Sequence, residues 1–270
     1  MEESLKTERS LCVLISCMHQ DETIIERSNI QTNVVVVNQC DENGIEEFDF
    51  TNRYGKTCHA KYICTKERGL SRSRNMAIRN CESDICVISD DDEFFSEGYE
   101  KDILEAYDQI ADAGILTFAF HRIDKPAYFS DKQSRMRLKE IMKTASIQIT
   151  FRRDLIEKHS IFFDEKMGSG TGNGGGEENK FLYDYYKKRV RMYYVPKYIT
   201  TLDNNKSLWR NGFTAEYFRN WGWSVRRILG PWLGAVYVFY TSVHHYRTYS
   251  PESTFLNALK NLIKGYFENR

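Results

Sequence analysis

The sequence predicts an α/β protein built on a doubly wound sheet, and three observations support this class. Short apolar runs of β-forming residues recur along the first half of the chain, with helical patterns between several of them. Polar residues directly follow three of these runs, at residues 16–19, 38–41 and 90–92. Doubly wound sheets bind their ligands at such strand ends. The 270 residues are also enough to bury one sizeable core and carry an appendage.

The first elements are expected to form a βαβ unit with parallel strands. Residues 11–15 and residues 34–37 are both continuously apolar, which predicts two buried strands. Between them, residues 22–31 predict a helix that turns Ile24, Ile25 and Ile30 inward. The next elements are a strand at residues 61–65 and a helix over residues 72–80, for which Ser71 is a suitable N-cap.

Residues 83–97 (SDICVISDDDEFFSE) are the stretch around which we expect the functional site to form. Their first half predicts a buried strand at residues 85–89, which ends in Asp90, Asp91 and Asp92. Three adjacent carboxylates repel one another, so a cation that prefers hard oxygen ligands, Mn²⁺ or Mg²⁺, would stabilise them. The alternative is a solvated acidic turn that caps a helix starting near Ser96.

The alternation of strands and helices continues beyond the acidic cluster. Apolar residues recur at helical spacing over residues 103–110, and residues 115–120 predict another strand. The basic, weakly patterned residues 125–143 are expected to form a mobile excursion. A strand at residues 147–151 and a short helix at residues 154–159 follow.

A glycine-rich loop is the most unusual segment of the chain. Six glycines between Gly168 and Gly176 forbid regular structure. A helix follows, with Glu177 and Glu178 in its first turn and Phe181, Leu182 and Tyr185 or Tyr186 as its buried face. A flexible linker is one alternative. A GxGxxG nucleotide motif is another, which we disfavour because carboxylates occupy the helix start where a pyrophosphate would bind. Acidic residues there are also ordinary partners of the helix dipole.

Cysteine usage and the opening residues indicate an intracellular protein. The seven cysteines show no CxxC pair and mostly lie in apolar runs, so we expect reduced core thiols in a cytosolic protein and no zinc site. Residues 1–10 are acidic and polar, and the apolar run after them is too short for a secretory signal. No stretch approaches the roughly 20 apolar residues of a membrane-spanning helix.

The C-terminal part is basic and aromatic. Residues 206–270 hold nine Lys and Arg against three Asp and Glu, whereas the whole chain has no net charge. Trp209, Trp221 and Trp223 alternate with arginines, including Arg210, Arg219, Arg226 and Arg227, and the apolar run 228–240 follows. We favour an amphipathic surface that lies in a membrane interface. A helix that packs back on the catalytic domain would use the same residues.

Three segments in this order resemble the family 2 glycosyltransferases of bacterial polysaccharide type, which are nucleotide-sugar-dependent enzymes of GT-A fold. They are GLSRSRNMAI at residues 69–78, ISDDDEFF at residues 88–95 and FDEKMGSGTGNGGGEENKFL at residues 163–182. The resemblance covers about residues 11–202. It implies a GT-A catalytic domain over residues 1–205, with a doubly wound mixed sheet, and a C-terminal helical extension over residues 206–270.

The resemblance also implies roles for individual residues. Asp90 and Asp92 match the DxD positions that hold the metal, Mn²⁺ or Mg²⁺, and the donor diphosphate. Glu177 and Glu178 match the acidic pair that includes the catalytic base, and Glu178 takes the place of the base. The residues expected to bind the nucleotide-sugar donor are Ser16, Asn38, Asp41, Arg68, Arg74, Asp90 and Asp91.

Two strand ends depart from the family pattern. Residues 16–19 (SCMH) replace P-x-Y-N, and residues 37–41 (VNQCD) replace V-D-D-G-S. Asn38 can still hydrogen-bond a base edge, so a UDP-sugar and a GDP-sugar both remain open. The late histidine of the family is not evident at residues 200–205, and the sequence therefore names no third metal ligand.

The expected function is metal-dependent, inverting transfer of a sugar to a glycan or lipid-linked glycan, with the glycine-rich loop as a lid that excludes water. The alternatives are a catalytically inactive, membrane-peripheral sugar-nucleotide binding module and a nucleotidyltransferase of related fold. A nucleotidyltransferase would carry a glycine-rich basic loop after the first strand, and residues 16–22 have none. We expect no nucleic-acid partner and a cytoplasmic location with peripheral contact at the inner face of the plasma membrane. A homodimer also remains open.

Overall fold

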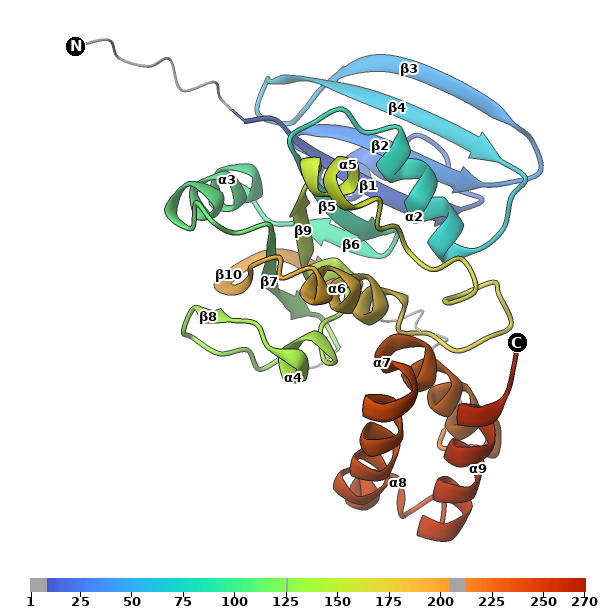
Figure 1. The fold of residues 1–270 in the computed structure, drawn as a ribbon. Helices are drawn as coiled ribbons and strands as arrows, with labels where there is room; N and C mark the ends of the chain where they lie inside the picture. Colours follow the sequence, from blue (N-terminus) through green and yellow to red (C-terminus); the bar gives the residue numbers. More distant parts are fainter. Residues whose placement is uncertain (1–8, 125, 204–211) are drawn as a thin grey trace.

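The computed structural model describes residues 9–124, 126–203 and 212–270. Within these residues ten strands form one mixed sheet in the order β3-β4-β2-β1-β5-β9-β7-β10-β6, with β8 beside β10 (Figure 1). The strands are β1 (Leu11–Met18), β2 (Asn33–Gln39), β3 (Gly44–Thr51), β4 (Thr57–Thr65), β5 (Ile85–Asp90), β6 (Glu93–Phe95), β7 (Ile115–Arg122), β8 (Ser134–Arg135), β9 (Ile149–Arg152) and β10 (Met192–Leu202). The helices are α1 (Ile24–Arg27), α2 (Leu70–Arg79), α3 (Tyr99–Gln109), α4 (Leu138–Ile141), α5 (Asp154–His159), α6 (Glu177–Lys187), α7 (Ala215–His244), α8 (Tyr246–Tyr249) and α9 (Phe255–Phe267), with a 3-10 turn η1 (Ser146–Gln148).

The centre of the sheet is parallel, as the βαβ pattern predicts. β1 lies between β2 and β5, and β2 pairs with β4. In this register Ser16 is opposite Asp90, Cys17 is opposite Asn38, and Asn38 is opposite Cys64. The polar strand ends predicted from the sequence therefore meet at one edge of the sheet.

Helices cover both faces of the sheet, which confirms the doubly wound α/β class. Along β1, Val13 and Ile15 belong to an apolar cluster that includes residues of α1 and α3, whereas Leu14 belongs to a second cluster with residues of α2, α5 and α6. In Figure 1, α2 and α5 lie over the near face of the sheet. Of the two tyrosines considered for the buried face of α6, Tyr185 is buried and Tyr186 is exposed.

Four strands lie where the sequence pattern predicts none, namely β3, β6, β8 and β10. The side chains of β3 are mostly exposed because it is an edge strand that pairs only with β4. It therefore lacks an apolar run. β10 contains Pro196, and its pairing with β7 shifts register between Val195 and Tyr198, which hides its strand periodicity.

Two predicted helices begin or end elsewhere. The helix expected over residues 22–31 is only α1, because Asn29 adopts a left-handed conformation (φ 54°) and its Nδ2 donates a hydrogen bond to the Phe95 carbonyl oxygen (2.7 Å). The second helix, α2, starts after Gly69, whose φ is 123°. Ser71 is therefore not its N-cap, and its Oγ donates instead to the carbonyl oxygen of Met167 (2.8 Å).

The excursion predicted as mobile has ordered elements within residues 126–143, and Lys125 lies outside the described residues. It contains β8 and α4. Its Met136 and Ile141 are buried in the apolar cluster that also holds residues of α2, α5 and α6. The weak sequence pattern reflects how few of its side chains are buried.

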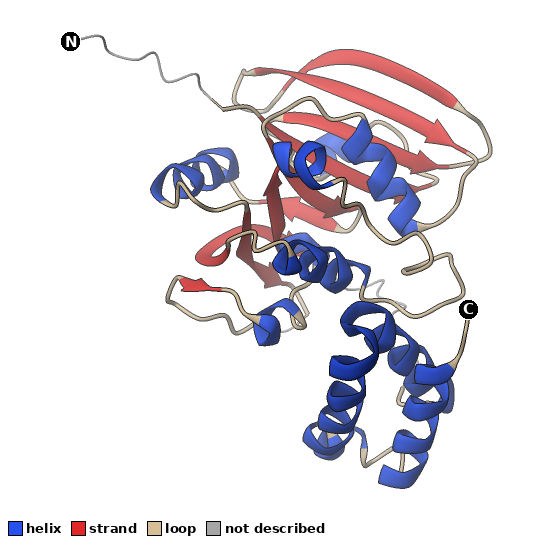
Figure 2. Cartoon of the chain, viewed as in Figure 1, coloured by secondary structure: helices blue, strands red, loops and turns tan. Residues whose placement is uncertain are grey.

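The C-terminal helices form a hairpin beside the sheet domain, with α7 and α9 side by side (Figure 2). Their backbones touch at Gly222 and Gly265, where an added Cβ would collide with the carbonyls of Leu262 and Arg219 respectively. α7 is interrupted at Gly230 (φ 75°, ψ −172°), just before Pro231. None of the helices in the described ranges has both the length and the apolar character needed to cross a bilayer.

The hairpin packs on the sheet domain through a third apolar cluster, in which Phe218 and Trp223 meet Met142 and Met167. Arg227 also donates from Nε and Nη2 to the Asp164 carboxylate (2.6 and 2.8 Å). The predicted boundary between residues 205 and 206, together with Trp209 and Arg210, lies outside the described residues. The two-domain division stays a prediction.

Candidate active site

A cavity of about 210 Å³ lies at the carboxyl ends of β1, β2 and β5, which is where a doubly wound sheet binds ligands. Ser16 and Gln39 line it from β1 and β2, the three aspartates line it from the end of β5, and Gly170 of the glycine-rich loop closes one side. The Ser16 Oγ is buried, and no protein group in the described structure hydrogen-bonds to it. A buried hydroxyl without a partner at a cavity wall is available to a ligand.

Arg74 connects the three segments on which the family resemblance depends. Its side chain is 1% exposed; Nη1 donates to Glu177 Oε1 (3.0 Å) and Nη2 donates to both carboxylate oxygens of Asp90 (2.8 and 3.1 Å). Burial lowers the pKa of the Arg74 guanidinium, but the negative charges of Asp90, Glu177 and Glu178 outweigh this effect. The pKa is therefore raised above the ordinary value. α2, β5 and α6 are thus held together by one buried cation.

The remaining acidic residues at the end of β5 crowd one another. Burial, followed by the charges of Asp90 and Asp91, raises the pKa of Asp92 to about 6, and the carboxylate of Asp203 at the end of β10 adds to this effect. Burial and the charge of Asp90 likewise raise the pKa of Glu93, whose Oε1 accepts a hydrogen bond from the Asp90 amide (2.8 Å). Asp92 and Glu93 thus lie where negative charges are concentrated.

A hard divalent cation fits this arrangement. Arg74 already neutralises Asp90, whereas Asp92 lies among like charges that a cation would relieve. The charges of Asp91 and Asp203 act on Asp92, and carboxylate oxygens are the ligand type that Mn²⁺ and Mg²⁺ prefer. Asp203 is a candidate ligand that the sequence does not reveal, because it follows β10, a strand that the sequence does not predict.

The structure places the other predicted donor residues around the cavity in different ways. Arg68 lines it, and its guanidinium donates to the carbonyl oxygens of Cys40 (2.8 Å) and Thr65 (3.1 Å) and pairs with the exposed Asp41. Asn38 does not direct its amide toward the cavity. Its Oδ1 accepts from the Gln20 amide (3.0 Å) and its Nδ2 donates to the Gln20 carbonyl (2.7 Å), so Asn38 positions the loop after β1.

The glycine-rich loop is anchored on both sides. The Leu70 amide donates to the Ser169 carbonyl oxygen (3.0 Å), and a Cβ on Gly170 would lie 3.2 Å from the Gly69 Cα. On the other side Gly174 lies against α7, where a Cβ would collide with Ser224 and Asn220. The loop therefore packs between α2 and α7, which argues against a flexible linker, whereas its role as a lid stays a prediction.

A second cavity of about 560 Å³ lies between this loop and α7, and Glu178 lines it together with Tyr217, Trp221 and Ser224. Burial, followed by the charge of Glu177, raises the pKa of Glu178 to about 8. Glu177 is instead buried against Arg74. The two cavities share Ser169 and Gly170, so Glu178 and the acidic cluster lie on either side of one loop.

Several residues of the site carry no signal in the sequence. Gln20 Nε2 donates to Asp91 Oδ2 (3.0 Å), Gln39 Oε1 accepts from the Gly69 amide (2.7 Å), and Ser146 Oγ donates to Asp90 Oδ2 (3.3 Å). Gln20 lies in a loop, Gln39 lies at the end of β2, and Ser146 begins η1. Only the fold brings Gln20 and Ser146 to the aspartates.

Comparisons with known proteins agree with this geometry. The family model described as glycosyl transferase family 2 matches residues 22–170. S. aureus TarS 1–349 is similar in structure, with a TM-score of 0.63 and 16% sequence identity over 96% of this chain and 81% of that chain. Its complex with UDP-GlcNAc gives a TM-score of 0.65 and 17% identity over 95% of this chain and 81% of that chain. A search of curated proteins found no match.

These likenesses and the mixed sheet confirm the predicted GT-A fold. The matched residues span more than half of the chain, and they include Arg74, the three aspartates and the start of the glycine-rich loop. The chain is therefore a glycosyltransferase that belongs to glycosyl transferase family 2.

Proposed function

We propose that this protein transfers a sugar from a nucleoside-diphosphate donor to a glycan or lipid-linked glycan, with the help of a divalent metal and with inversion at the anomeric carbon. The observation that carries the proposal is the pair of contacts that the buried Arg74 makes with Asp90 and Glu177. These contacts fix the acidic end of β5, which lines the smaller cavity, relative to Glu178, which lines the cavity beside α7. Sugar transfer needs this pairing of a phosphate site with a base.

The donor side is the cavity of about 210 Å³. We propose that Asp92 holds Mn²⁺ or Mg²⁺, with Asp91 or Asp203 as a further ligand, and that the bound ion would neutralise the donor diphosphate. The Ser16 hydroxyl and the Arg68 guanidinium are two hydrogen-bond donors that line the same cavity. Since TarS has been crystallised with UDP-GlcNAc and with UDP, a UDP-sugar is the first donor to test.

The acceptor side is the cavity beside α7. Glu178 accepts the proton of the acceptor hydroxyl as general base, and that oxygen attacks the anomeric carbon. The bond from this carbon to the diphosphate breaks on the opposite face, which inverts the configuration. Trp221 and Tyr217 offer aromatic surface for a sugar ring, and the buried Ser224 Oγ, which has no hydrogen-bond partner in the described structure, offers a polar contact.

A panel of UDP- and GDP-sugars incubated with Mn²⁺ tests the proposal without knowledge of the acceptor. We expect slow release of free nucleoside diphosphate from one donor, because water can replace the acceptor hydroxyl, and we expect EDTA to stop the release. Donor binding without release in the presence of glycan acceptors would favour the inactive binding module. Release of pyrophosphate from a nucleoside triphosphate and a sugar 1-phosphate would favour the nucleotidyltransferase.

We further propose that the helical hairpin contacts a membrane from the predicted apolar run 228–240 onward, and not through the tryptophans and arginines that precede this run. Trp223 is buried, Arg227 pairs with Asp164, and Arg226 lies over the Tyr266 ring. The exposed apolar residues lie further along α7 and on α9, and they are Trp232, Val236, Phe239, Val243, Leu256, Ile263 and Phe267. On α7 they follow helical spacing, so they form one apolar stripe.

Flotation with anionic liposomes tests this contact. The full chain is expected to float, and the double substitution Trp232→Ser and Phe239→Ser is expected to abolish flotation without lowering the melting temperature, because both side chains are exposed. Tyr128→Ser is the matched control, since Tyr128 is exposed in the sheet domain. A wild-type protein that fails to float but dimerises, with the double variant monomeric, would identify the stripe as a subunit interface.

A further inference from the structure

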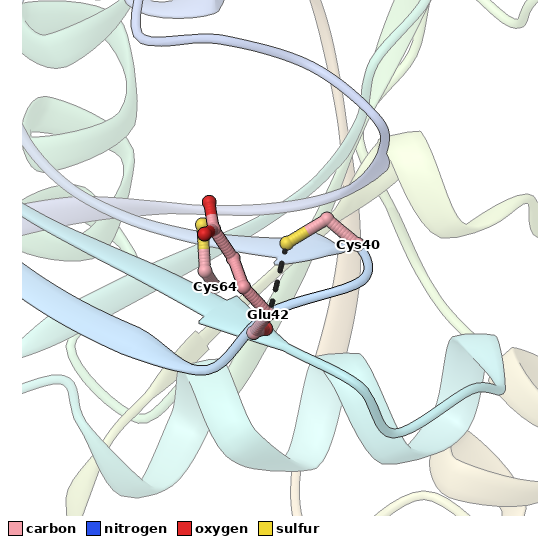
Figure 3. Close-up of side chains that lie close together, drawn as sticks. All are labelled: Cys40, Glu42 and Cys64. Atoms are coloured by element: carbon pink, nitrogen blue, oxygen red, sulfur yellow. Dashed lines mark hydrogen bonds between the residues drawn. The ribbon is translucent and has the colours of Figure 1, made fainter.

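Cys40, Glu42 and Cys64 come together beside the donor cavity (Figure 3). The two thiol sulfurs and a carboxylate oxygen all lie within 4.8 Å of one another. Across residues 9–124, 126–203 and 212–270, no other three side chains of His, Cys, Asp or Glu meet this condition. Figure 3 shows the Glu42 side chain extending over the Cys64 thiol, with Cys40 on the other side.

The sheet itself creates this cluster. Cys64 on β4 is paired with Asn38 of β2 on one side and with Gly44 of β3 on the other. The connection from β2 to β3 carries Cys40 and Glu42, so it folds back over Cys64. No CxxC spacing is needed, because pairing of three strands brings the ligands together. The sequence gives no indication of this cluster for that reason.

The chemistry of the three groups suits a soft cation. Thiolates select Zn²⁺ over the hard ions Mg²⁺ and Mn²⁺, and a carboxylate oxygen is a common third ligand of zinc. The surrounding cavity of about 850 Å³ is also lined by Asp21, Glu22 and Glu46, whose negative charge favours a cation. With three protein ligands, water completes a tetrahedral site.

We propose that Cys40, Cys64 and Glu42 bind one Zn²⁺ ion at a site separate from the aspartate cluster of the active site. This inference does not depend on sugar transfer. Binding displaces the thiol protons and forms two sulfur–zinc bonds, since the thiolate is the ligand. The consequence for the fold is local: the ion fixes the connection between β2 and β3, whose Cys40 carbonyl also accepts a hydrogen bond from Arg68 (2.8 Å).

Competition with a chromophoric zinc chelator measures the site directly in the reduced, metal-free full chain. We expect one Zn²⁺ per chain, at least about tenfold weaker binding in Cys64→Ser and Cys40→Ser, and a smaller loss in Glu42→Gln. Cys58→Ser is the matched control, because Cys58 lies at the other end of β4 and bonds the Gln31 carbonyl oxygen through its thiol (3.3 Å). Its zinc affinity should equal that of the wild type.

Co²⁺ substitution provides a second readout, since sulfur ligation gives a charge-transfer absorption that oxygen ligands do not. We expect this band in the wild type and in Cys58→Ser and a weaker band in Cys64→Ser. Glu42 is exposed, so Glu42→Gln remains informative even if a cysteine variant does not fold. Zinc binding that survives Cys64→Ser unchanged, or that Asp92→Asn removes instead, would overturn the proposal.

Discussion

Replacing Glu178 by Gln is expected to lower the rate of sugar transfer about 100-fold or more, which is the usual loss of rate when a general base is removed. The affinity for the donor should remain nearly unchanged. Glu178 lines the cavity beside α7 rather than the aspartate cavity, so its charge does not hold the donor. A single-turnover assay with the donor found in the panel measures the rate, and calorimetry with UDP measures the affinity.

The pH dependence of the same reaction provides an independent check. The pKa of Glu178 is raised to about 8, mainly by burial and then by Glu177, and a general base acts only when it is ionised. The rate at subsaturating donor should therefore rise with pH from about 7 to about 9 in the wild type, and Glu178→Gln should lack this rise. A flat wild-type profile would exclude Glu178 as the base.

The stability of the variants shows whether a slower reaction results from loss of the general base or from damage to the fold. A carboxyl group whose pKa is higher in the folded than in the unfolded state favours folding in its neutral form, and this advantage is lost as the pH rises through the folded pKa. Glu178→Gln should therefore be at least as stable as the wild type at pH 8 and above. Glu177→Gln should instead destabilise the protein, because Glu177 is buried against Arg74. A larger kinetic loss in a stable Glu177→Gln variant would reverse the two roles.

The parallel half of the fold is predictable from the sequence because its strands are buried on both faces and appear as continuous apolar runs. β1, β2, β5 and β7 were predicted for this reason. The antiparallel edge strands β3 and β6 and the bulged β10 carry no such run. α1 is shorter than its apolar periodicity suggests because Asn29 makes a tertiary hydrogen bond that ends it.

The sequence predicts those parts of the candidate site whose reactive side chains are neighbours in the chain. Consecutive carboxylates at residues 90–92 and at the start of α6 are visible in the sequence, whereas the pairing of Arg74 with both segments depends on the fold. The amide of Asn38 has the right chemistry to recognise a base, but Gln20 occupies both of its polar atoms. The cluster of Cys40 and Cys64 depends on strand pairing that no linear motif encodes.

Asp92→Asn and Asp90→Asn are expected to have opposite effects on stability, although both residues belong to one acidic cluster. Asp92 has a raised pKa, of about 6, because of burial and like charges, so its ionised form disfavours folding at pH 8 in the absence of metal. The Asp92→Asn variant should therefore have a melting temperature in EDTA that is no lower than that of the wild type. It should also lose metal-dependent UDP binding by at least about tenfold, because a ligand of the proposed ion is removed.

Asp90→Asn should lower the free energy of unfolding by about 3 kcal/mol, since it leaves the buried Arg74 guanidinium with one carboxylate partner in place of two. This magnitude lies at the low end for breaking a buried ion pair, because the Asp90 side chain is 26% exposed and keeps some solvation. Denaturant unfolding of both variants in EDTA, beside UDP calorimetry with Mn²⁺, separates the two roles. If Asp90→Asn unfolds like the wild type yet abolishes metal-dependent UDP binding, Asp90 is a metal ligand and its contact with Arg74 contributes little to the fold.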